Sequence, residues 1–236
     1  MDDTMKWLIG IDETARCPAL MPLYVLGMAT TEPELKKMKQ KLTLKDSKLT
    51  TPKQREKAFK YVILRSRKFK FELIKIAPET IDMAVSGKLP LKMNLNDLEA
   101  VAMMNIIDRL VKRIKKEDKN ATFFVYINNF ERERKQFIDR AKSLGYTPNG
   151  YKLTLTHKYY DIISLASMVC KHIEDTETKS WKFIYNFDFG SKNPNDKRTQ
   201  EFVRKFPHSW IIRRKWGTII PRILKEVENN GTQNQE

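Results

Sequence analysis

The segment WLIGIDE at residues 7–13 constrains this chain most, because it is an apolar run that ends on two adjacent carboxylates, Asp12 and Glu13. A short apolar run predicts a buried strand. Such a strand delivers its acids to the edge of a sheet, where carboxylate oxygens are ligands for a hard divalent cation such as Mg²⁺. Two acids at a strand end are by themselves more common in a solvated turn, so this interpretation depends on the rest of the chain.

Strand-like and helix-like segments alternate downstream. We expect strands at residues 7–12, 23–30, 69–77, 123–127 and 150–156. We expect helices at residues 34–42, 52–66, 96–116, 131–144, 161–176, 199–206 and 218–227, and a short helix after Pro78. Thr51 is the expected N-cap of a helix that begins at Pro52, and Asp161 is the expected N-cap of another. The alternation predicts an α/β fold with a central mixed sheet flanked by helices.

The 236 residues are enough for one large domain with a substantial buried core. We expect a single domain over residues 1–228, with a core at about 7–190 and a basic helical part at 191–228. The polar end, residues 229–236, is expected to be disordered.

The charge of the chain is strongly basic. It holds 45 Lys and Arg against 29 Asp and Glu, a formal net charge of +16, and its pI is about 9.7. A lysine-rich proteome would spread such an excess evenly, but residues 197–225 contain nine basic residues and one acid. Clustered positive charge favours a polyanionic partner, and the sequence therefore predicts nucleic-acid binding.

The cellular location follows from what the chain lacks. Its two cysteines, Cys17 and Cys170, are far apart and have no metal-binding spacing, which fits a reducing compartment. The first residues carry charges and no long apolar core, so they do not form a signal peptide. No run approaches the roughly 18 apolar residues that span a bilayer. We expect a cytoplasmic protein that contacts no membrane.

Six strings occur in an order and at spacings that are typical of one family. They are GIDETARCP, LKDSKLT, LNDLEAVAMM, ISLASMVCK, FDFGSKNPNDKRT and IIRRKWGT. Together they resemble the ribonuclease HII (type 2 ribonuclease H) family in its archaeal form, over roughly residues 7–225. The resemblance implies a ribonuclease H-like fold. It also implies four carboxylates that hold two divalent metals, Mg²⁺ or Mn²⁺, for hydrolysis at a ribonucleotide in a duplex.

The four acidic positions are only half preserved. Asp12 and Glu13 match the first two acids of the family. The third position falls on Asn128 in FFVYINNF, and counting back from Ser167 without gaps places the fourth on His157. A gapped alignment brings Asp161 forward as the alternative fourth acid.

This substitution pattern predicts weak metal binding. Four carboxylates offset the repulsion between two Mg²⁺ ions roughly 3.5–4 Å apart. An Asn side chain brings no charge, and histidine is a poor ligand for Mg²⁺. We therefore expect at most one weakly held Mg²⁺ or Mn²⁺ at Asp12 and Glu13, or no metal.

The resemblance also implies positions that contact nucleic acid. The family's G-R-G clamp on the ribose becomes Ala15, Arg16 and Cys17, and its Gly-Tyr pair, whose tyrosine stacks on the sugar, becomes Lys192 and Asn193. Side chains in place of glycine obstruct a close backbone approach. The phosphate-facing residues are kept, and they are Lys45, Ser47, Lys48, Arg213, Arg214 and Lys215. We expect both arginines at the surface.

These observations leave three functions open. The first is a catalytically inactive module that binds RNA/DNA hybrid or another duplex, inside a larger complex with protein partners. The second is a divergent, metal-dependent ribonuclease H that cleaves RNA in RNA/DNA hybrids. The third is a purely structural scaffold. Cleavage and binding assays discriminate among them.

Overall fold

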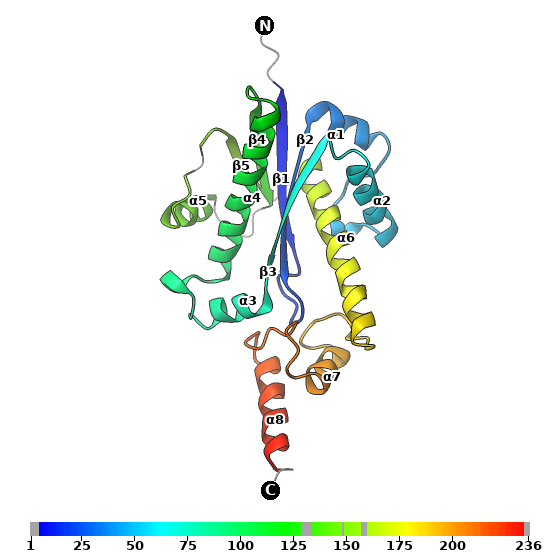
Figure 1. Ribbon diagram of the computed structural model, residues 1–236, viewed down its shortest axis with the longest axis vertical. Coiled ribbons are helices and arrows are strands. Elements are labelled where there is room, and N and C mark those ends of the chain that lie inside the picture. Colours follow the sequence, from blue (N-terminus) through cyan, green and yellow to red (C-terminus); the bar gives the residue numbers. More distant parts are fainter. Residues whose placement is uncertain (1–4, 129–133, 148, 157–159, 234–236) are drawn as a thin grey trace. The chain divides into compact units, whose positions relative to one another are not determined.

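A computed structural model of the protein describes residues 5–128, 134–147, 149–156 and 160–233 (Figure 1). Its strands are β1 (Lys6–Thr14), β2 (Leu23–Thr31), β3 (Phe69–Ile76), β4 (Thr122–Asn128) and β5 (Lys152–Thr156). They form a five-stranded sheet in the order β3-β2-β1-β4-β5. β1 is antiparallel to β2 and parallel to β4, which is in turn parallel to β5. The predicted α/β fold with a mixed sheet is confirmed.

Helices fill the segments between the strands and the C-terminal part. They are α1 (Glu32–Lys39), α2 (Pro52–Ile63), α3 (Pro78–Val85), α4 (Leu95–Glu117), α5 (Arg134–Ser143), α6 (Asp161–Ile184), α7 (Lys197–Lys205) and α8 (Ile219–Gln233). Two single 3-10 turns, η1 (Ser47–Leu49) and η2 (Pro90–Lys92), complete the set. Within the ranges that the structure describes, no helix is both long and apolar enough to cross a membrane.

The chain forms two compact units. The first, which we call the sheet unit, comprises Met1–Thr14, Tyr24–Ile74 and Glu99–Glu174. The second, the C-terminal unit, comprises Ala15–Leu23, Lys75–Leu98 and Asp175–Glu236. The C-terminal unit thus includes two earlier stretches of chain, Ala15–Leu23 and Lys75–Leu98, in addition to the basic part predicted after residue 190. The extent of a single domain over residues 1–228 stays a prediction.

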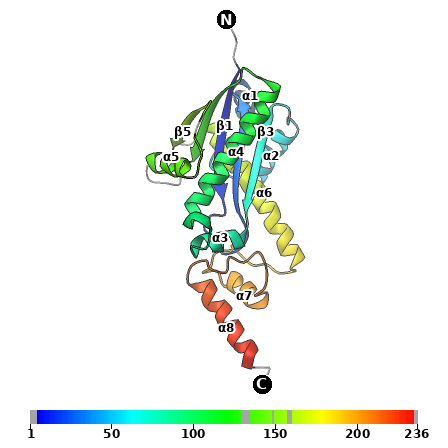
Figure 2. The same ribbon diagram turned by 60° about the vertical axis from the view of Figure 1, so that its left-hand side comes forward.

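Helices cover both faces of the sheet at its centre. A Cβ added to Gly10 of β1 would lie 2.4 Å from the backbone oxygen of Ile162 in α6. A Cβ added to Gly27 of β2 would lie 2.2 Å from a methyl group of Ile106 in α4. Gly27 pairs with Ile11, the residue after Gly10, so the two glycines lie on opposite faces. Figures 1 and 2 show α6 and α4 on the two sides of β1 accordingly.

The helix starts follow local rules. Thr51 is the N-cap of α2, since its hydroxyl accepts a hydrogen bond from Gln54 N at 3.3 Å, and Gln54 Oε1 accepts one from Thr51 N at 2.8 Å. This reciprocal capping box confirms the predicted start at Pro52. The N-cap predicted for α6 is wrong by one residue. The Tyr160 carbonyl accepts the first bond, from Ser164 N at 2.9 Å, and Asp161 is the first helical residue.

Two helices are longer than the sequence predicts, and both are anchored by apolar contacts in the C-terminal unit. Its buried cluster consists of Ala19, Leu20, Met21, Phe189, Phe202, Val203, Ile211, Ile212, Ile220, Ile223 and Leu224. Trp181 packs against this cluster, which extends α6 from the predicted residue 176 to Ile184. The buried side chains of α8 anchor a helix that continues to Gln233. The disorder predicted from Asn229 is therefore wrong through Gln233.

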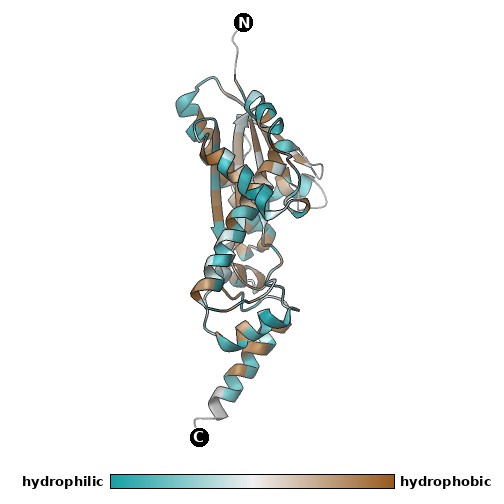
Figure 3. Ribbon diagram, turned by 90° about the vertical axis from the view of Figure 1, so that its right-hand side faces the viewer, coloured by the Kyte–Doolittle hydropathy of each residue, from teal (hydrophilic) through white to brown (hydrophobic). Residues whose placement is uncertain are grey.

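The remaining predicted elements agree to within a few residues, and the period of apolar residues explains why. In Figure 3 the strands are largely apolar, and the helices carry apolar and polar residues on different sides. The helix predicted at 131–144 is observed as Arg134–Ser143, and residues 131–133 lie outside the described part of the chain.

Candidate functional site

The carboxylate of Asp12 lies beside the side-chain amide of Asn128 at the end of the two central parallel strands. The β1–β4 register pairs Ile11 with Ile127, so the next residue on each strand is also adjacent. Asn128 Nδ2 donates a hydrogen bond to Asp12 Oδ1 at 2.9 Å. The amide thus presents its nitrogen, and not its oxygen, to the carboxylate.

Helix α6 supplies a second hydrogen-bond donor to the same carboxylate. The Ser167 hydroxyl bonds to Asp12 and also accepts a hydrogen bond from the backbone N of Ser47 at 3.2 Å. Asp46 Oδ1 accepts a bond from Lys48 N at 2.8 Å, which closes the turn. Through Ser167, the structure brings the predicted phosphate-binding turn of Lys45, Ser47 and Lys48 next to Asp12.

Burial dominates the electrostatics of Asp12, which is only 5% exposed. Loss of hydration raises the pKa of its carboxyl group above the ordinary value. Hydrogen bonds from Asn128, Ser167 and the backbone of Glu13 oppose this increase, and the negative charge of Asp46 adds to it. These donors are neutral, so they hold the carboxyl group of Asp12 in place and add no positive charge beside it.

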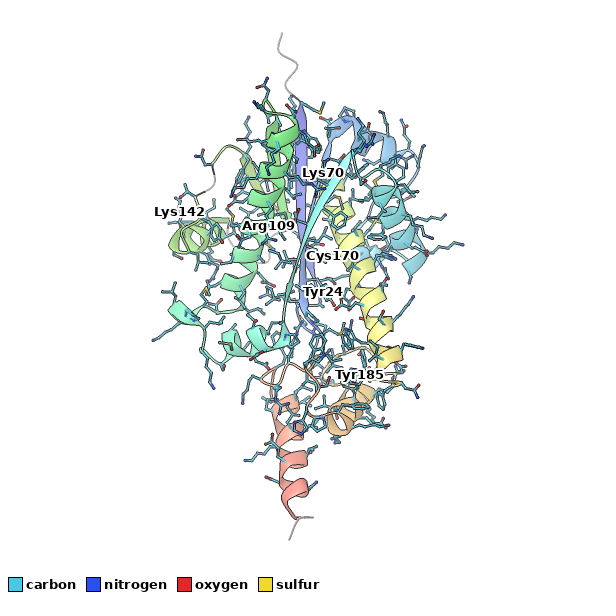
Figure 4. The ribbon with its side chains drawn as sticks, in the orientation of Figure 1. Tyr24, Lys70, Arg109, Lys142, Cys170 and Tyr185 are labelled. Atoms are coloured by element: carbon cyan, nitrogen blue, oxygen red, sulfur yellow. The ribbon has the colours of Figure 1, made fainter. Side chains whose placement is uncertain are left out.

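The next buried titratable group along α6 is Cys170. Burial, followed by the charges of Asp12 and Glu13, raises the pKa of its thiol well above the ordinary value. Its sulfur lies 3.8 Å from the backbone oxygen of Tyr24, and Figure 4 shows both residues between α6 and the sheet. A neutral, buried thiol is inert, so Cys170 fills space beside the site.

The two candidates for the fourth acid are placed differently. His157 lies outside the described residues. Asp161 forms an ion pair with Lys39 of α1 at 2.6 Å and is partly exposed. It lies six residues before Ser167, about 9 Å along the axis of α6 at 1.5 Å per residue. The structure therefore places Asp161 away from Asp12, so the gapped alignment does not bring a third acid to the site.

The donor set at Asp12 does not fit a metal pair. Among the residues that the structure describes, no cluster of three or more His, Cys, Asp or Glu side chains is arranged to hold a metal ion. An Asn128 amide that turned its oxygen toward a cation would also give up the bond to Asp12. Asp12 and the half-buried Glu13 remain as the only acidic candidates of the predicted four in the described part of the chain.

In the C-terminal unit, the loop that follows β1 is held by Arg213. This side chain is fully buried and donates to three backbone oxygens. Nε bonds Met21 at 2.9 Å, Nη1 bonds Arg16 at 2.7 Å and Nη2 bonds Ala15 at 2.5 Å. The expectation that Arg213 lies at the surface is wrong. A guanidinium offers five donors in a planar fork, which suits three converging carbonyls.

Residues close to Arg213 form further hydrogen bonds that hold the loop after β1 and the segment after Arg213. The Trp216 indole donates to the Cys17 carbonyl at 2.8 Å, and the Arg16 guanidinium donates to Asn96 Oδ1 at 2.7 Å. Asp82 accepts from the backbone N of Arg214 at 2.6 Å and of Lys215 at 2.8 Å. The Arg214 side chain is partly exposed and Lys215 is exposed. Lys215 remains available at the surface of the C-terminal unit, whereas the Arg214 guanidinium donates to the Pro207 carbonyl at 2.5 Å and lies 3.6 Å from the carboxylate of Glu228.

The sequence matches the family model of ribonuclease HII over residues 9–219. The chain is 31% identical to ribonuclease HII of Methanococcus aeolicus, an alignment that covers 98% of this chain and 86% of the relative. It resembles the crystal structure of ribonuclease H2 from Pyrococcus horikoshii with a TM-score of 0.75, at 25% identity over 95% of this chain and 100% of the other. The ribonuclease HII in a complex with PCNA from Archaeoglobus fulgidus gives a TM-score of 0.66, at 22% identity over 89% and 93%.

The chain belongs to the ribonuclease HII family. This confirms the resemblance from the six sequence strings. The substituted residues of this chain can therefore be compared with the ribonuclease HII pattern.

Two positions that carry glycine in the family pattern keep a glycine-like backbone here. Ala15 has φ of 61° and Lys192 has φ of 70°, both in the left-handed region that side chains disfavour. The Lys192 carbonyl accepts a bond from Ala19 N at 2.8 Å, and its ammonium group bonds Thr178 Oγ1 at 2.9 Å. Asn193 lies next to it, with its side-chain oxygen bonded to Asn195 N at 2.9 Å. Both loops thus keep a backbone suited to glycine although their side chains differ from the ribonuclease HII pattern.

Sequence reasoning missed three features, two in the C-terminal unit and one in the sheet unit. Arginine is usually exposed, so nothing local marked Arg213 as buried. The left-handed φ of Ala15 is equally unexpected for a residue with a side chain. The hydroxyl of Ser167 was also missed as a partner of Asp12, although it lies in a string that resembles the family and was the one signal that could have linked α6 to Asp12.

Replacing Asp12 with Asn should raise the free energy of unfolding at pH 7. The folded-state pKa of Asp12 is raised, so the native protein loses stability as pH increases from the ordinary pKa through the raised one. The amide in the Asp12→Asn variant cannot ionise, so its advantage should grow over that range and vanish at lower pH. Chemical denaturation at several pH values measures it, with the exposed Asp139→Asn as control. An Asp12→Asn variant that is equally destabilised at every pH would contradict this prediction.

Replacing Arg213 with Ala should lower the free energy of unfolding by about 3 kcal/mol or more, because three carbonyls lose a charged donor and one buried side chain is removed. Arg213→Lys should restore little, since an ammonium group lacks the guanidinium fork. The exposed Arg222→Ala is the control and should cost no more than about 1 kcal/mol. Urea denaturation measures all three, and equal effects for Arg213→Ala and Arg222→Ala would refute the role of Arg213.

Proposed function

We propose that this member of the ribonuclease HII family binds duplexes that contain RNA/DNA hybrid, and that its hydrolytic activity is lost or severely reduced. In this proposal the protein acts in the cytoplasm as a binding module or subunit of a nucleic-acid-processing complex. The hydrogen bond from the Asn128 amide to Asp12 carries the proposal, because Asn128 stands at the third acidic position of the family pattern.

The reason is electrostatic. A carboxylate at position 128 would lie about as close to Asp12 as the amide nitrogen does, at 2.9 Å. Two like charges at that separation need a cation or a shared proton between them. The amide removes this requirement, since it donates to Asp12 and adds no charge. A single carboxylate that is hydrogen-bonded by an amide attracts Mg²⁺ more weakly than two adjacent carboxylates that repel each other without a cation.

Nucleic-acid binding is supported by the cationic residues that remain accessible. In the sheet unit these are Lys45 and Lys48, which flank the Ser47–Ser167 contact. In the C-terminal unit they are Arg214 and Lys215, which lie next to the loop of Ala15, Arg16 and Cys17. Asn193 belongs to a different loop of the same unit. The net charge of +16 favours association with any polyanion. A protein partner also belongs to the proposal, since the Archaeoglobus fulgidus relative occurs in a complex with PCNA.

The second candidate function is a divergent, metal-dependent ribonuclease H that cleaves RNA in RNA/DNA hybrids. Family membership and the retained pair Asp12 and Glu13 favour it. In this case the two acids would hold one Mg²⁺ or Mn²⁺ ion, which would polarise a phosphate oxygen or activate a water molecule. Cleavage assays separate the two functions.

Native protein should cleave RNA/DNA hybrid, or a DNA duplex with one ribonucleotide, no faster than its Asp12→Asn variant in millimolar Mg²⁺ or Mn²⁺. The double variant Asn128→Asp, His157→Asp should gain metal-dependent cleavage, because it restores two acids on the same backbone. Recovery should be partial, since misplacement by about 1 Å costs about 100-fold in rate. Strong native cleavage that Asp12→Asn abolishes would establish the second function instead.

Binding should be set by phosphate contacts, and its salt dependence measures them. The double variant Lys45→Ala, Lys48→Ala should weaken hybrid binding evenly across sequences. It should reduce the slope of log K against log salt by up to about two, at about 0.9 per phosphate contact. The matched control is Lys112→Ala, Lys116→Ala on exposed positions of α4. Equal slopes for native protein and the Lys45 and Lys48 variant, measured by anisotropy, would remove this turn from the interface.

A further inference from the structure

A cavity of about 320 Å³ lies in the sheet unit, on the same face as α6. Its apolar part is formed by Leu8 of β1, Leu35 of α1 and Ile162 of α6. Tyr126 of β4 and Tyr160, the residue before α6, complete that wall. A volume of this size is at the lower end of small-molecule sites, and it suits one planar ring with its substituents.

The two tyrosines give this cavity a stacking surface. Their rings are stacked, with centroids 4.7 Å apart and an interplanar angle of 30°. Tyr160 is 40% exposed, while Tyr126 is half-buried. Exposed aromatic rings that are already held in place by a partner bind nucleobases with little loss of side-chain freedom. The pair therefore offers an ordered platform for a base.

Two lysines of α1 stand at the rim. Lys36 is paired with Glu32 at 2.7 Å and Lys39 with Asp161 at 2.6 Å. The exposed fractions of these four side chains range from 38% for Asp161 to 72% for Lys36. Exposed ion pairs contribute little to stability, so a phosphate can take a lysine from its carboxylate at small cost. The cavity is also lined by Glu32 and Asp161, so a phosphate would replace these carboxylates as the partners of Lys36 and Lys39 next to the aromatic platform.

The cavity lies at a short, defined distance from Asp12. Asp161 precedes Ser167, which bonds Asp12, by six residues of α6, about 9 Å along its axis. Leu8 precedes Asp12 by four residues of β1, about 13 Å of strand. At about 3.4 Å per stacked nucleotide, this distance corresponds to roughly three or four nucleotides.

We propose that this cavity binds an unpaired nucleotide, with its base stacked on Tyr160 and its phosphate at Lys36 and Lys39, three or four nucleotides from the strand segment at Asp12. This inference rests on the proposed nucleic-acid binding and specifies it. The preferred ligand is a duplex that ends in, or is interrupted by, a short single-stranded segment.

The test compares three probes in EDTA, which prevents cleavage. They are a blunt hybrid duplex, the same duplex with a four-nucleotide overhang at either end that contains 2-aminopurine, and the free 2-aminopurine tetranucleotide. Native protein should bind one of the overhang duplexes at least about fivefold more tightly than the blunt one, as expected when one base stacks on an aromatic ring. The 2-aminopurine fluorescence should be quenched on binding.

The variants assign the effect to the cavity. Tyr160→Ala should abolish the overhang gain and the quenching and leave blunt-duplex affinity unchanged, whereas Tyr160→Phe should keep both. Tyr61→Ala is the matched control, because Tyr61 of α2 contacts Phe69 with ring centroids 5.8 Å apart and does not line the cavity. Circular dichroism verifies that each variant is folded.

The outcomes separate the two proposals. Failure to bind the blunt duplex would overturn the proposed function, and the free tetranucleotide would still report on the cavity. Blunt binding without an overhang gain, or a gain and quenching that survive in Tyr160→Ala, would overturn this inference alone. If the tetranucleotide and both overhang duplexes show no Tyr160-dependent quenching, the cavity does not bind unpaired nucleotides.

Discussion

The register between β1 and β4 determines what the centre of this protein can do. Parallel pairing places Asp12 and Asn128 side by side at the ends of two buried strands, and the amide nitrogen lies 2.9 Å from the carboxylate oxygen. Asp and Asn have nearly the same shape, so the exchange preserves the packing of the strand ends. What changes is charge, because a position that would repel Asp12 now donates a hydrogen bond to it. Helix α6 adds the Ser167 hydroxyl to the same carboxylate.

Arg213 has a comparable role in the C-terminal unit. Its guanidinium binds the carbonyls of Ala15 and Arg16, and it thereby fixes a loop whose first residue has a left-handed φ of 61°. An alanine in that region costs about 1–2 kcal/mol relative to its ordinary conformations. Lys192 shows the same combination of a side chain and a left-handed φ. Three-point fixation by a buried cation is a physical reason why the first loop keeps its shape without glycine.

The fold was largely predictable from the sequence because apolar periodicity and caps are local signals. Thr51, Gln54 and Pro52 specify a helix start without reference to the rest of the chain. The position of Asn128 beside Asp12 was also predictable, since Asn128 ends an apolar strand in a string that resembles the family. Arg213 was not, because its burial depends on carbonyls almost 200 positions earlier. The helical end of α8 was missed for a related reason, since its anchor is the buried cluster that includes Ile220 and Ile223.

Helix α6 relates the two candidate sites of the sheet unit. It runs along β1 with Gly10 against Ile162 and Asp12 against Ser167, so its first turn borders the tyrosine cavity and its second turn borders Asp12. Gly10 is essential to this arrangement, because any side chain there would meet the α6 backbone at 2.4 Å. Because α6 and β1 are in such close contact, neither site can shift along the helix independently of the other. The Asn128 amide differs from a carboxylate in charge and hardly in shape, so its presence beside Asp12 requires no change in how α6 packs on β1.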